Sequence, residues 1–276
     1  PTTTRSPVLA AMGFATLSSM APGRIAAGLG ASSPIVVGDW HGRNFTKPLA
    51  TTRDFIEIFR AAISGQKVSI ETETLRTNNF RLAIDPEAEL PIWLAAINDR
   101  MLRLAGAIAD GVILTWCPPT EVQQKVDLVR AGAIEAGRDP SDIEVGLSFW
   151  GFEGNDDDVS IVRERCRRSV LAYAMVPTHQ SAFLHAFPTL TEAAAAWDLG
   201  DRKKALDLTG DDVLEAMCPI GPPGVVSDRV HQYVAAGVDL PVVFLVGPGR
   251  SGPEPALQTM RSTAAALALT SDTSAS

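Results

Sequence analysis

The chain has 276 residues, of which 46% are hydrophobic and 20% charged, and its formal net charge is −8. This balance is ordinary for a globular protein, and the negative charge argues against nucleic acid as the main partner. No apolar run is long enough for a membrane span, and three cysteines without metal-binding spacing predict neither a disulfide framework nor a metal site. We therefore expect a cytoplasmic protein without a membrane or nucleic-acid partner.

Hydrophobic spacing predicts that helices alternate with short strands in the first part of the chain. The expected elements are a helix at 5–20, a strand at 25–29, a loop to 49, a helix at 50–64 and a hairpin at 67–82. In the first helix, the residues expected on the buried side are Val8, Leu9, Met12, Ala15, Leu17 and Met20. Gly65 ends the second helix, because glycine readily closes a helix.

Residues 91–116 predict a strand, a helix and a second strand in a short stretch. The apolar run Ile92–Ala95 is the first strand, Asn98 is a good helix N-cap, and Val112–Trp116 is the second strand. So short a connection implies a parallel βαβ unit. The corner between the first strand and the helix should then present backbone N–H groups, which can bind an anion such as a phosphate.

The rest of the chain continues the alternation. The expected elements are a helix at 119–136, a strand at 143–149, a helix at 156–175, irregular helical pieces at 176–222, a helix at 225–236 and a strand at 240–246. Strands alternating with helices indicate a parallel sheet with helices outside it, and five short apolar strands are typical of a barrel. The tail at 270–276 is expected to be disordered.

A family resemblance rests on an ordered series of segments rather than on one specific motif. The segments are GRIAAGLGASSP, WHGRNFTKPLATTRDFIEIFRAAISGQKV, PIWLAA, LRLAGAIADGVILTW and YVAAGVDLPVVF, between Thr4 and Gly247. They resemble the luciferase-like monooxygenase family, and within it the branch that uses the deazaflavin coenzyme F420. The resemblance implies an α/β fold, a (β/α)8 TIM barrel of the bacterial luciferase-like type. It also implies N-terminal truncation, with about five of the eight strands present. Residues 1–269 would form this domain, with an insertion at about 176–222 before the last strand.

The same resemblance implies an oxidoreductase that transfers hydride between reduced coenzyme F420 and an unknown small organic substrate, as a homodimer. One alternative is an FMN-dependent monooxygenase of the same fold. Another is a non-catalytic truncated homologue. A phosphosugar-type barrel enzyme ranks last, because no lysine or glutamate stands at the strand ends where such enzymes need one.

Active sites of such barrels lie at the C-terminal ends of the strands, which selects the candidate cofactor-binding residues. They are Gly30, Ala31, Ser32, Ser33, Ala95, Ala96, Ile97, Asn98, Thr115 and Trp116. By resemblance, Ala95–Asn98 and Thr115 hold the phosphate, Gly30–Ser33 approach the ring, and Trp116 walls the pocket. The structural alternatives are a plain glycine turn, a helix cap and a core tryptophan.

No catalytic side chain is identified by the sequence. The one candidate is His41, because histidine carries protons near neutral pH, although a loop histidine is more often a surface residue. His179 and His185 fall in the expected insertion and are hypothesised to line the substrate side.

Overall fold

The computed structural model describes residues 1–84, 89–249 and 252–267. The chain divides into two compact units. The first unit contains Pro1–Ile113 and Lys125–Glu144, and the second contains Leu114–Gln124 and Val145–Ser276. The expected disordered tail at 270–276 lies outside the described residues.

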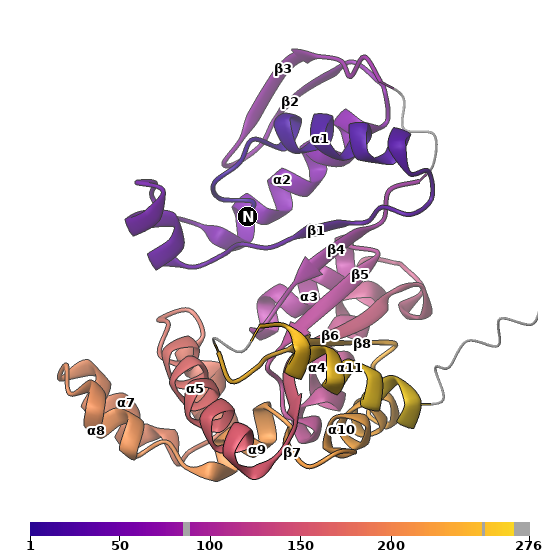
Figure 1. Ribbon diagram of the computed structural model, residues 1–276. Helices are drawn as coiled ribbons and strands as arrows, with labels where there is room; N and C mark the ends of the chain where they lie inside the picture. Colours follow the sequence, from indigo (N-terminus) through magenta and orange to yellow (C-terminus); the bar gives the residue numbers. More distant parts are fainter. Residues whose placement is uncertain (85–88, 250–251, 268–276) are drawn as a thin grey trace, which may run out of the picture. The chain divides into compact units, whose positions relative to one another are not determined.

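The first unit is built on parallel strands. Strand β1 (Ala27–Leu29) pairs in parallel with β4 (Ile92–Ala95), and β4 pairs in parallel with β5 (Gly111–Thr115), whose last two residues belong to the second unit. Helix α3 (Asp99–Ile108) connects β4 to β5, and Asn98 is its N-cap in extended conformation. The predicted βαβ unit is therefore confirmed, and Figure 1 shows it in magenta. Strand β5 ends one residue earlier than predicted, since Trp116 has a left-handed φ of 46°.

Helix α1 (Pro7–Met20) forms as predicted, but of the residues expected on its buried side Ala15 is buried while Leu9, Met12, Leu17 and Met20 are exposed. Its buried residues include Ala11 and Ala15, while Leu9 is 63% and Met20 77% exposed. The prediction was wrong for the large apolar residues because α1 packs on α2 (Pro48–Ile63) through small side chains, which permit a close approach. Figure 1 shows the two helices side by side.

A short helix after β1 and a hairpin complete the comparison of this unit with the sequence predictions. The expected loop at 30–49 contains a short π-helix, η1 (Ile35–Trp40), so that prediction was incomplete. The predicted hairpin is present as antiparallel strands β2 (Val68–Glu71) and β3 (Arg76–Phe80). Helix α4 (Pro119–Glu135) and a 3₁₀ turn, η2 (Pro140–Asp142), complete the first half of the chain.

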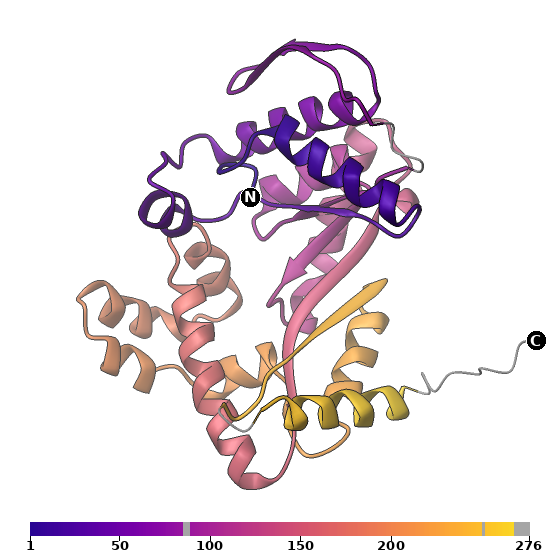
Figure 2. The same ribbon diagram turned by 45° about the horizontal axis from the view of Figure 1, so that its top comes forward.

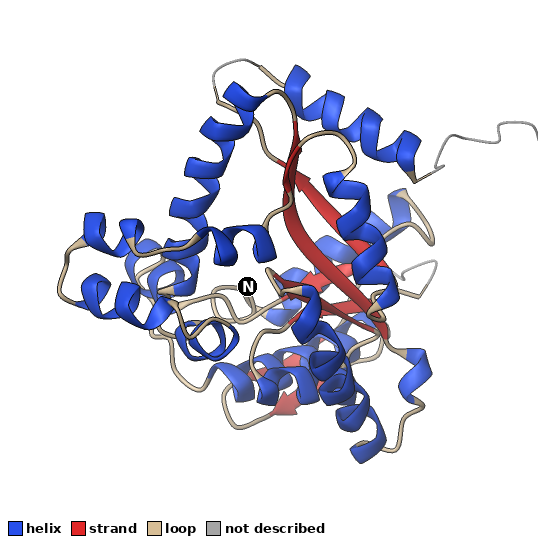
Figure 3. Ribbon diagram, turned by 90° about the horizontal axis from the view of Figure 1, so that it is seen from below, coloured by secondary structure: helices blue, strands red, loops and turns tan. Residues whose placement is uncertain are grey.

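The second unit is organised on one long strand. Strand β6 (Glu144–Glu153) pairs in parallel with β8 (Leu240–Leu245) and with the short β7 (Ile220–Gly221). The long, curved β6 with β8 beside it is visible in Figure 2, and β6 stands out among the red strands of Figure 3. The sequence missed β7, which was read as irregular chain, and placed the end of β6 four residues too early, at 149 rather than 153. The described parallel strands are thus β1, β4, β5, β6, β7 and β8.

Helices make up most of the remaining second unit. They are α5 (Asp156–Ala174), α6 (Gln180–Ala186), α7 (Leu190–Asp198), α8 (Arg202–Asp207), α9 (Asp211–Met217), α10 (Val225–Ala235) and α11 (Glu254–Ala266). Among the described residues, no helix is both long and apolar enough to cross a membrane.

One buried carboxylate ties strand β6 to helix α10. Glu153 is only 4% exposed, and its Oε1 accepts hydrogen bonds from the N–H groups of Gly224 at 3.0 Å and Val226 at 3.1 Å. These are donors that the first turn of a helix cannot satisfy itself. Its Oε2 accepts a bond from Ser262 of α11, and a cavity of about 520 Å³ lies beside these groups. Glu153 therefore serves as a cap and a junction between β6, α10 and α11.

Candidate functional site

The C-terminal ends of β1 and β4 lie next to each other in the first unit. The strands pair with Leu29 opposite Leu94, so the residues that follow them start at the same edge of the sheet. A Cβ atom at Gly30 would lie 3.3 Å from the Cβ of Ala95. The structure thus brings together two of the predicted segments, Gly30–Ser33 and Ala95–Asn98.

The loop after β1 is bonded through its carbonyl groups. The N–H of Thr2 donates to the carbonyl of Gly30 at 2.9 Å, and the Thr3 hydroxyl donates to the carbonyl of Ala31 at 2.8 Å. Ser32 has a left-handed φ of 67°, a conformation that costs energy for any residue other than glycine and is concentrated at functional sites. Among the described residues, the amide N–H groups of Ala31, Ser32 and Ser33 donate no hydrogen bond. The loop after β1 therefore offers backbone N–H donors to a bound group.

The corner after β4 offers donors as well. The N–H of Ala96 is used by the carbonyl of Ile113 at 3.1 Å, and helix α3 begins just beyond Asn98. The N–H of Met101 donates to the Asn98 carbonyl at 2.9 Å, whereas the first N–H groups of an α-helix have no partner inside the helix and carry the positive end of its dipole. Lys125 of α4 donates from Nζ to the carbonyl of Ile97 at 3.3 Å and adds a positive charge to this corner. The exposed Asp99 in the first turn is a negative charge nearby.

This donor set fits the phosphate end of a cofactor. An anion needs N–H donors and a cation, and the corner of Ile97 and the start of α3 supplies both, with Lys125 as the cation. Lys125 was missed by the sequence, because its contact with Ile97 spans 28 residues and depends on how α4 packs.

Thr115 and Trp116 lie in the second unit, where both already have partners. The Ser148 hydroxyl lies 3.2 Å from the Thr115 hydroxyl, and the N–H of Trp116 donates to the Ser148 carbonyl at 3.1 Å. Trp116 is 7% exposed and packs edge-to-face against Trp150 and Tyr173, with ring centroids 4.9 and 4.7 Å apart. Trp116 is therefore part of the core of this unit. Its role and that of Thr115 in cofactor binding stay predictions.

His179, which the sequence analysis placed on the substrate side, contacts aromatic residues of the second unit that the sequence did not select. The ring of His179 lies 4.3 Å from that of Tyr173, and Phe183 contacts Tyr173 at 5.8 Å. Burial raises the pKa of Tyr173 to about 12. Burial also lowers the pKa of His179, which the bond to the Tyr173 carbonyl only partly offsets. Both side chains are thus uncharged at neutral pH. Tyr173 could be found only from the fold, since it is an ordinary apolar position of helix α5.

His41 directly follows η1 and is exposed. No hydrogen bond of its side chain occurs within the described part of the chain, and no charged group is bonded to it there. Its catalytic role stays a prediction.

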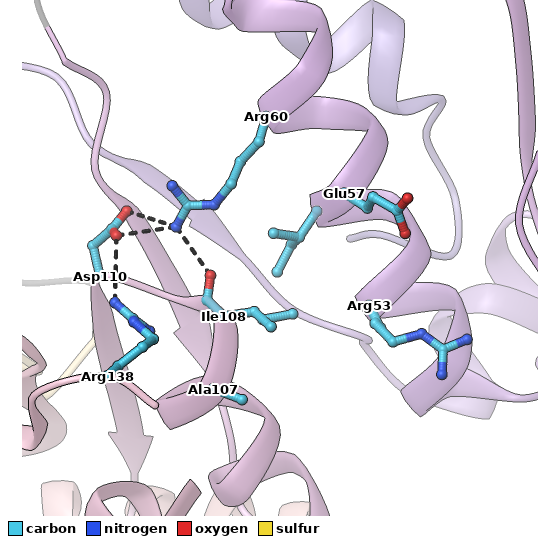
Figure 4. Close-up of a pocket in the computed structure, with 8 residues that line it drawn as sticks. Arg53, Glu57, Arg60, Ala107, Ile108, Asp110 and Arg138 are labelled. Atoms are coloured by element: carbon cyan, nitrogen blue, oxygen red, sulfur yellow. Dashed lines mark hydrogen bonds and ion pairs between the residues drawn. The ribbon is translucent and has the colours of Figure 1, made fainter. Parts of the chain in front are cut away.

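A cavity of about 470 Å³ in the first unit lies away from these strand ends. Figure 4 shows Arg60 and Arg138 on either side of Asp110, which precedes β5. Arg60 Nη2 donates to both Asp110 oxygens at 3.0 Å and to the Ile108 carbonyl at 2.9 Å. Asp110 also accepts from the N–H of Ile92 at 2.8 Å. These contacts satisfy a carbonyl at the C-terminus of α3 and lie at the N-terminal ends of the strands. In such barrels, residues at these ends stabilise the fold rather than take part in catalysis.

Parallel strands that alternate with helices are the arrangement of a (β/α)8 barrel, of which the described residues contain six parallel strands, one more than the five or so expected. The family model described as luciferase-like monooxygenase matches residues 1–240. The chain belongs to the luciferase-like monooxygenase family, and the predicted fold class is confirmed.

Three similar proteins illustrate this relationship. The 5,10-methylenetetrahydromethanopterin reductase of Methanolobus tindarius is 30% identical over 142 residues, which are 51% of this chain and 43% of the relative. The F420-dependent glucose-6-phosphate dehydrogenase of Nocardia farcinica is 30% identical over 179 residues, which are 60% of this chain and 51% of the relative. The solved coenzyme F420-dependent tetrahydromethanopterin reductase of Methanopyrus kandleri superposes with a TM-score of 0.71 at 24% identity, covering 92% of this chain and 77% of that one. The chain thus spans about half the length of the first two relatives.

Proposed function

We propose that this protein is an oxidoreductase that uses reduced coenzyme F420 to transfer hydride to or from a small organic substrate. The observation that carries the proposal is the donor set at the adjacent ends of β1 and β4, namely the free amides of Ala31–Ser33, the N-terminus of α3 and Lys125. The F420-dependent relatives in the same family support it. When bound, the deazaflavin supplies the hydride-carrying carbon.

The chain's own residues bind and orient the cofactor. The N-terminus of α3 and Lys125 hold the phosphate through N–H donors and charge. The amides of Ala31–Ser33 line the ring, next to the left-handed backbone of Ser32. Thr115 and Trp116 are proposed as further cofactor contacts on the basis of the family resemblance, and His41 as a proton carrier.

A binding titration tests the proposal. Coenzyme F420 and FMN are titrated separately, and each is followed by its own fluorescence. We expect F420 to bind more tightly than FMN. Lys125→Gln should weaken F420 binding about five- to tenfold, because a charge-assisted contact contributes on the order of 1 kcal/mol. The matched control is Lys67→Gln, which removes an exposed lysine just before β2.

Each contrary outcome has a clear meaning. Tighter binding of FMN than of F420 would favour the FMN-dependent monooxygenase alternative. Binding of neither cofactor would favour the non-catalytic homologue. Equal losses in the Lys125 and Lys67 variants would remove the α3 corner as the phosphate site, because a specific contact cannot be matched by general surface charge.

We further propose that residues 1–269 act as one functional domain, in which residues 176–222 are an insertion. The four helices α6–α9 in this range support that reading. We propose a homodimer that works in the cytoplasm. Among the described residues Cys117, Cys166 and Cys218 form no disulfide, which a reducing compartment favours. Light scattering on the purified protein tests the dimer.

A further inference from the structure

Four aromatic side chains of the second unit form a connected cluster. Trp116 contacts Trp150 and Tyr173, and Tyr173 contacts His179 with ring centroids 4.3 Å apart and planes tilted by 37°. Trp116 directly follows the C-terminal residue of β5, and Trp150 lies in the second half of β6. The cluster therefore stands at the strand ends where barrels of this class bind their substrates.

The contacts of His179 fix its tautomer. Its Nδ1 lies 3.2 Å from the backbone carbonyl oxygen of Tyr173. A carbonyl oxygen can only accept, so Nδ1 must carry the hydrogen and Nε2 must present a lone pair in the neutral ring. Burial lowers the pKa of His179, which keeps the ring in this neutral form. His179 is thus a hydrogen-bond acceptor through Nε2.

Tyr173 supplies the complementary donor. Burial holds its pKa at about 12, so the phenol stays protonated. Buried tyrosine hydroxyls usually have a hydrogen-bond partner. Among the described residues, however, neither the Tyr173 hydroxyl nor His179 Nε2 takes part in a hydrogen bond, and neither atom is sealed from solvent. A donor and an acceptor on touching rings are therefore both available to a ligand.

The chemistry of the cluster selects the class of ligand. Trp116, Trp150, Tyr173 and His179 are all uncharged, and a charged group placed against them would lose its hydration without a counter-charge. A phosphorylated substrate is therefore disfavoured here.

We propose that Tyr173 and His179 form the polar end of a substrate subsite for an uncharged compound with one hydroxyl group on an apolar body. The Tyr173 hydroxyl donates to the substrate oxygen, His179 Nε2 accepts the hydrogen of the substrate hydroxyl, and the half-buried Trp150, backed by the core residue Trp116, packs against the apolar body. The assignment of this ligand as substrate rests on the proposed oxidoreductase function. The subsite itself rests on the aromatic cluster.

Nitrogen NMR of the histidine rings tests the subsite directly, since the chain has only four histidines. The probes are cyclohexanol, an uncharged alcohol, and glucose 6-phosphate, an anion. We expect His179 to show the Nδ1–H tautomer in the free protein, and cyclohexanol to shift its Nε2 resonance. Tyr173→Phe and His179→Phe keep a ring in place and should each weaken cyclohexanol binding about three- to tenfold, the range of one lost hydrogen bond. His231→Phe, at an exposed position of α10, is the control and should not weaken it.

Three results would overturn the proposal. They are an Nε2–H tautomer for His179, an unshifted His179 in saturating cyclohexanol, or a shift as large with glucose 6-phosphate. The F420 titration on the same sample separates this failure from that of the proposed function. If cyclohexanol shifts the His179 resonance but F420 does not bind, the subsite is supported and F420 as the cofactor is refuted. If F420 binds but cyclohexanol leaves the His179 resonance unshifted, the cofactor is supported and the subsite is refuted.

Discussion

Helices α3 and α4 approach each other through two glycines of the first unit, and this contact makes a sharp stability prediction. A Cβ atom at Gly106 would lie 1.9 Å from the carbonyl oxygen of Val129, and one at Gly132 would lie 2.0 Å from the carbonyl oxygen of Arg103. Both obstacles are backbone atoms, which cannot rotate away. An alanine at either position therefore forces the two helices apart.

The magnitude follows from two opposing effects. Alanine is a better helix former than glycine by about 1 kcal/mol, which favours the substitution. Reaching an ordinary contact requires a displacement of about 1.5 Å, and overpacking of this kind costs typically 1–3 kcal/mol or more in a close-packed interior. We expect Gly106→Ala to lower the free energy of unfolding by roughly 1–3 kcal/mol. Gly132→Ala should do the same, and the double variant should lose less than the sum, because both act on one contact.

Urea unfolding monitored by circular dichroism measures these changes. The matched control is Gly13→Ala in helix α1, where no atom lies within 4 Å of the added Cβ. This control should gain up to about 1 kcal/mol from helix propensity alone. The reasoning is refuted if Gly106→Ala is as stable as Gly13→Ala, since the sequence context of both glycines is helical and only the neighbouring helix differs.

Three further predictions concern buried and bridging carboxylates. Burial works to raise the pKa of Asp54, but hydrogen bonds from Thr74 and Arg53 outweigh it and hold that pKa below its usual value. Because the pKa of Asp54 is lower in the folded than in the unfolded protein, its carboxylate stabilises the fold above the unfolded pKa. This contribution is lost as the pH falls through the folded pKa. Below about pH 4, the urea midpoint should therefore fall less steeply in Asp54→Asn than in the parent protein. Glu153→Leu should cost about 1–3 kcal/mol, because leucine has no oxygen to accept from the N–H groups of Gly224 and Val226, and faster hydrogen exchange at the start of α10 would show it. Asp110→Asn should cost about 0.5–1.5 kcal/mol in thermal unfolding, and an unchanged midpoint would contradict the bridging role.

Local signals were enough to predict the central βαβ unit. Asn98 is a good N-cap by residue type, and the alternation of apolar runs with helix-period spacing is a property of neighbouring residues. The corner after β4 could therefore be proposed as an anion site from the sequence, and the family resemblance could add Gly30–Ser33.

The buried face of α1 shows where local signals fail. The large apolar residues Leu9 and Met20 were expected to be buried with Ala15, whereas the structure exposes them and buries Ala15 together with Ala11. Helical periodicity shows which residues share a face, but the partner helix decides which face is buried. The face with small residues is buried when the partner helix packs at close distance.

What the sequence determined by itself is the order of helices and strands, the family, and the strand ends at which a cofactor is expected. Only the tertiary structure placed Lys125 on the Ile97 carbonyl and Tyr173 against Trp116 and His179. The physical reason is that helix and strand formation depends on residues a few positions apart. A binding site depends on contacts between side chains that are distant in the chain, and these are fixed only when the packing of the elements is known.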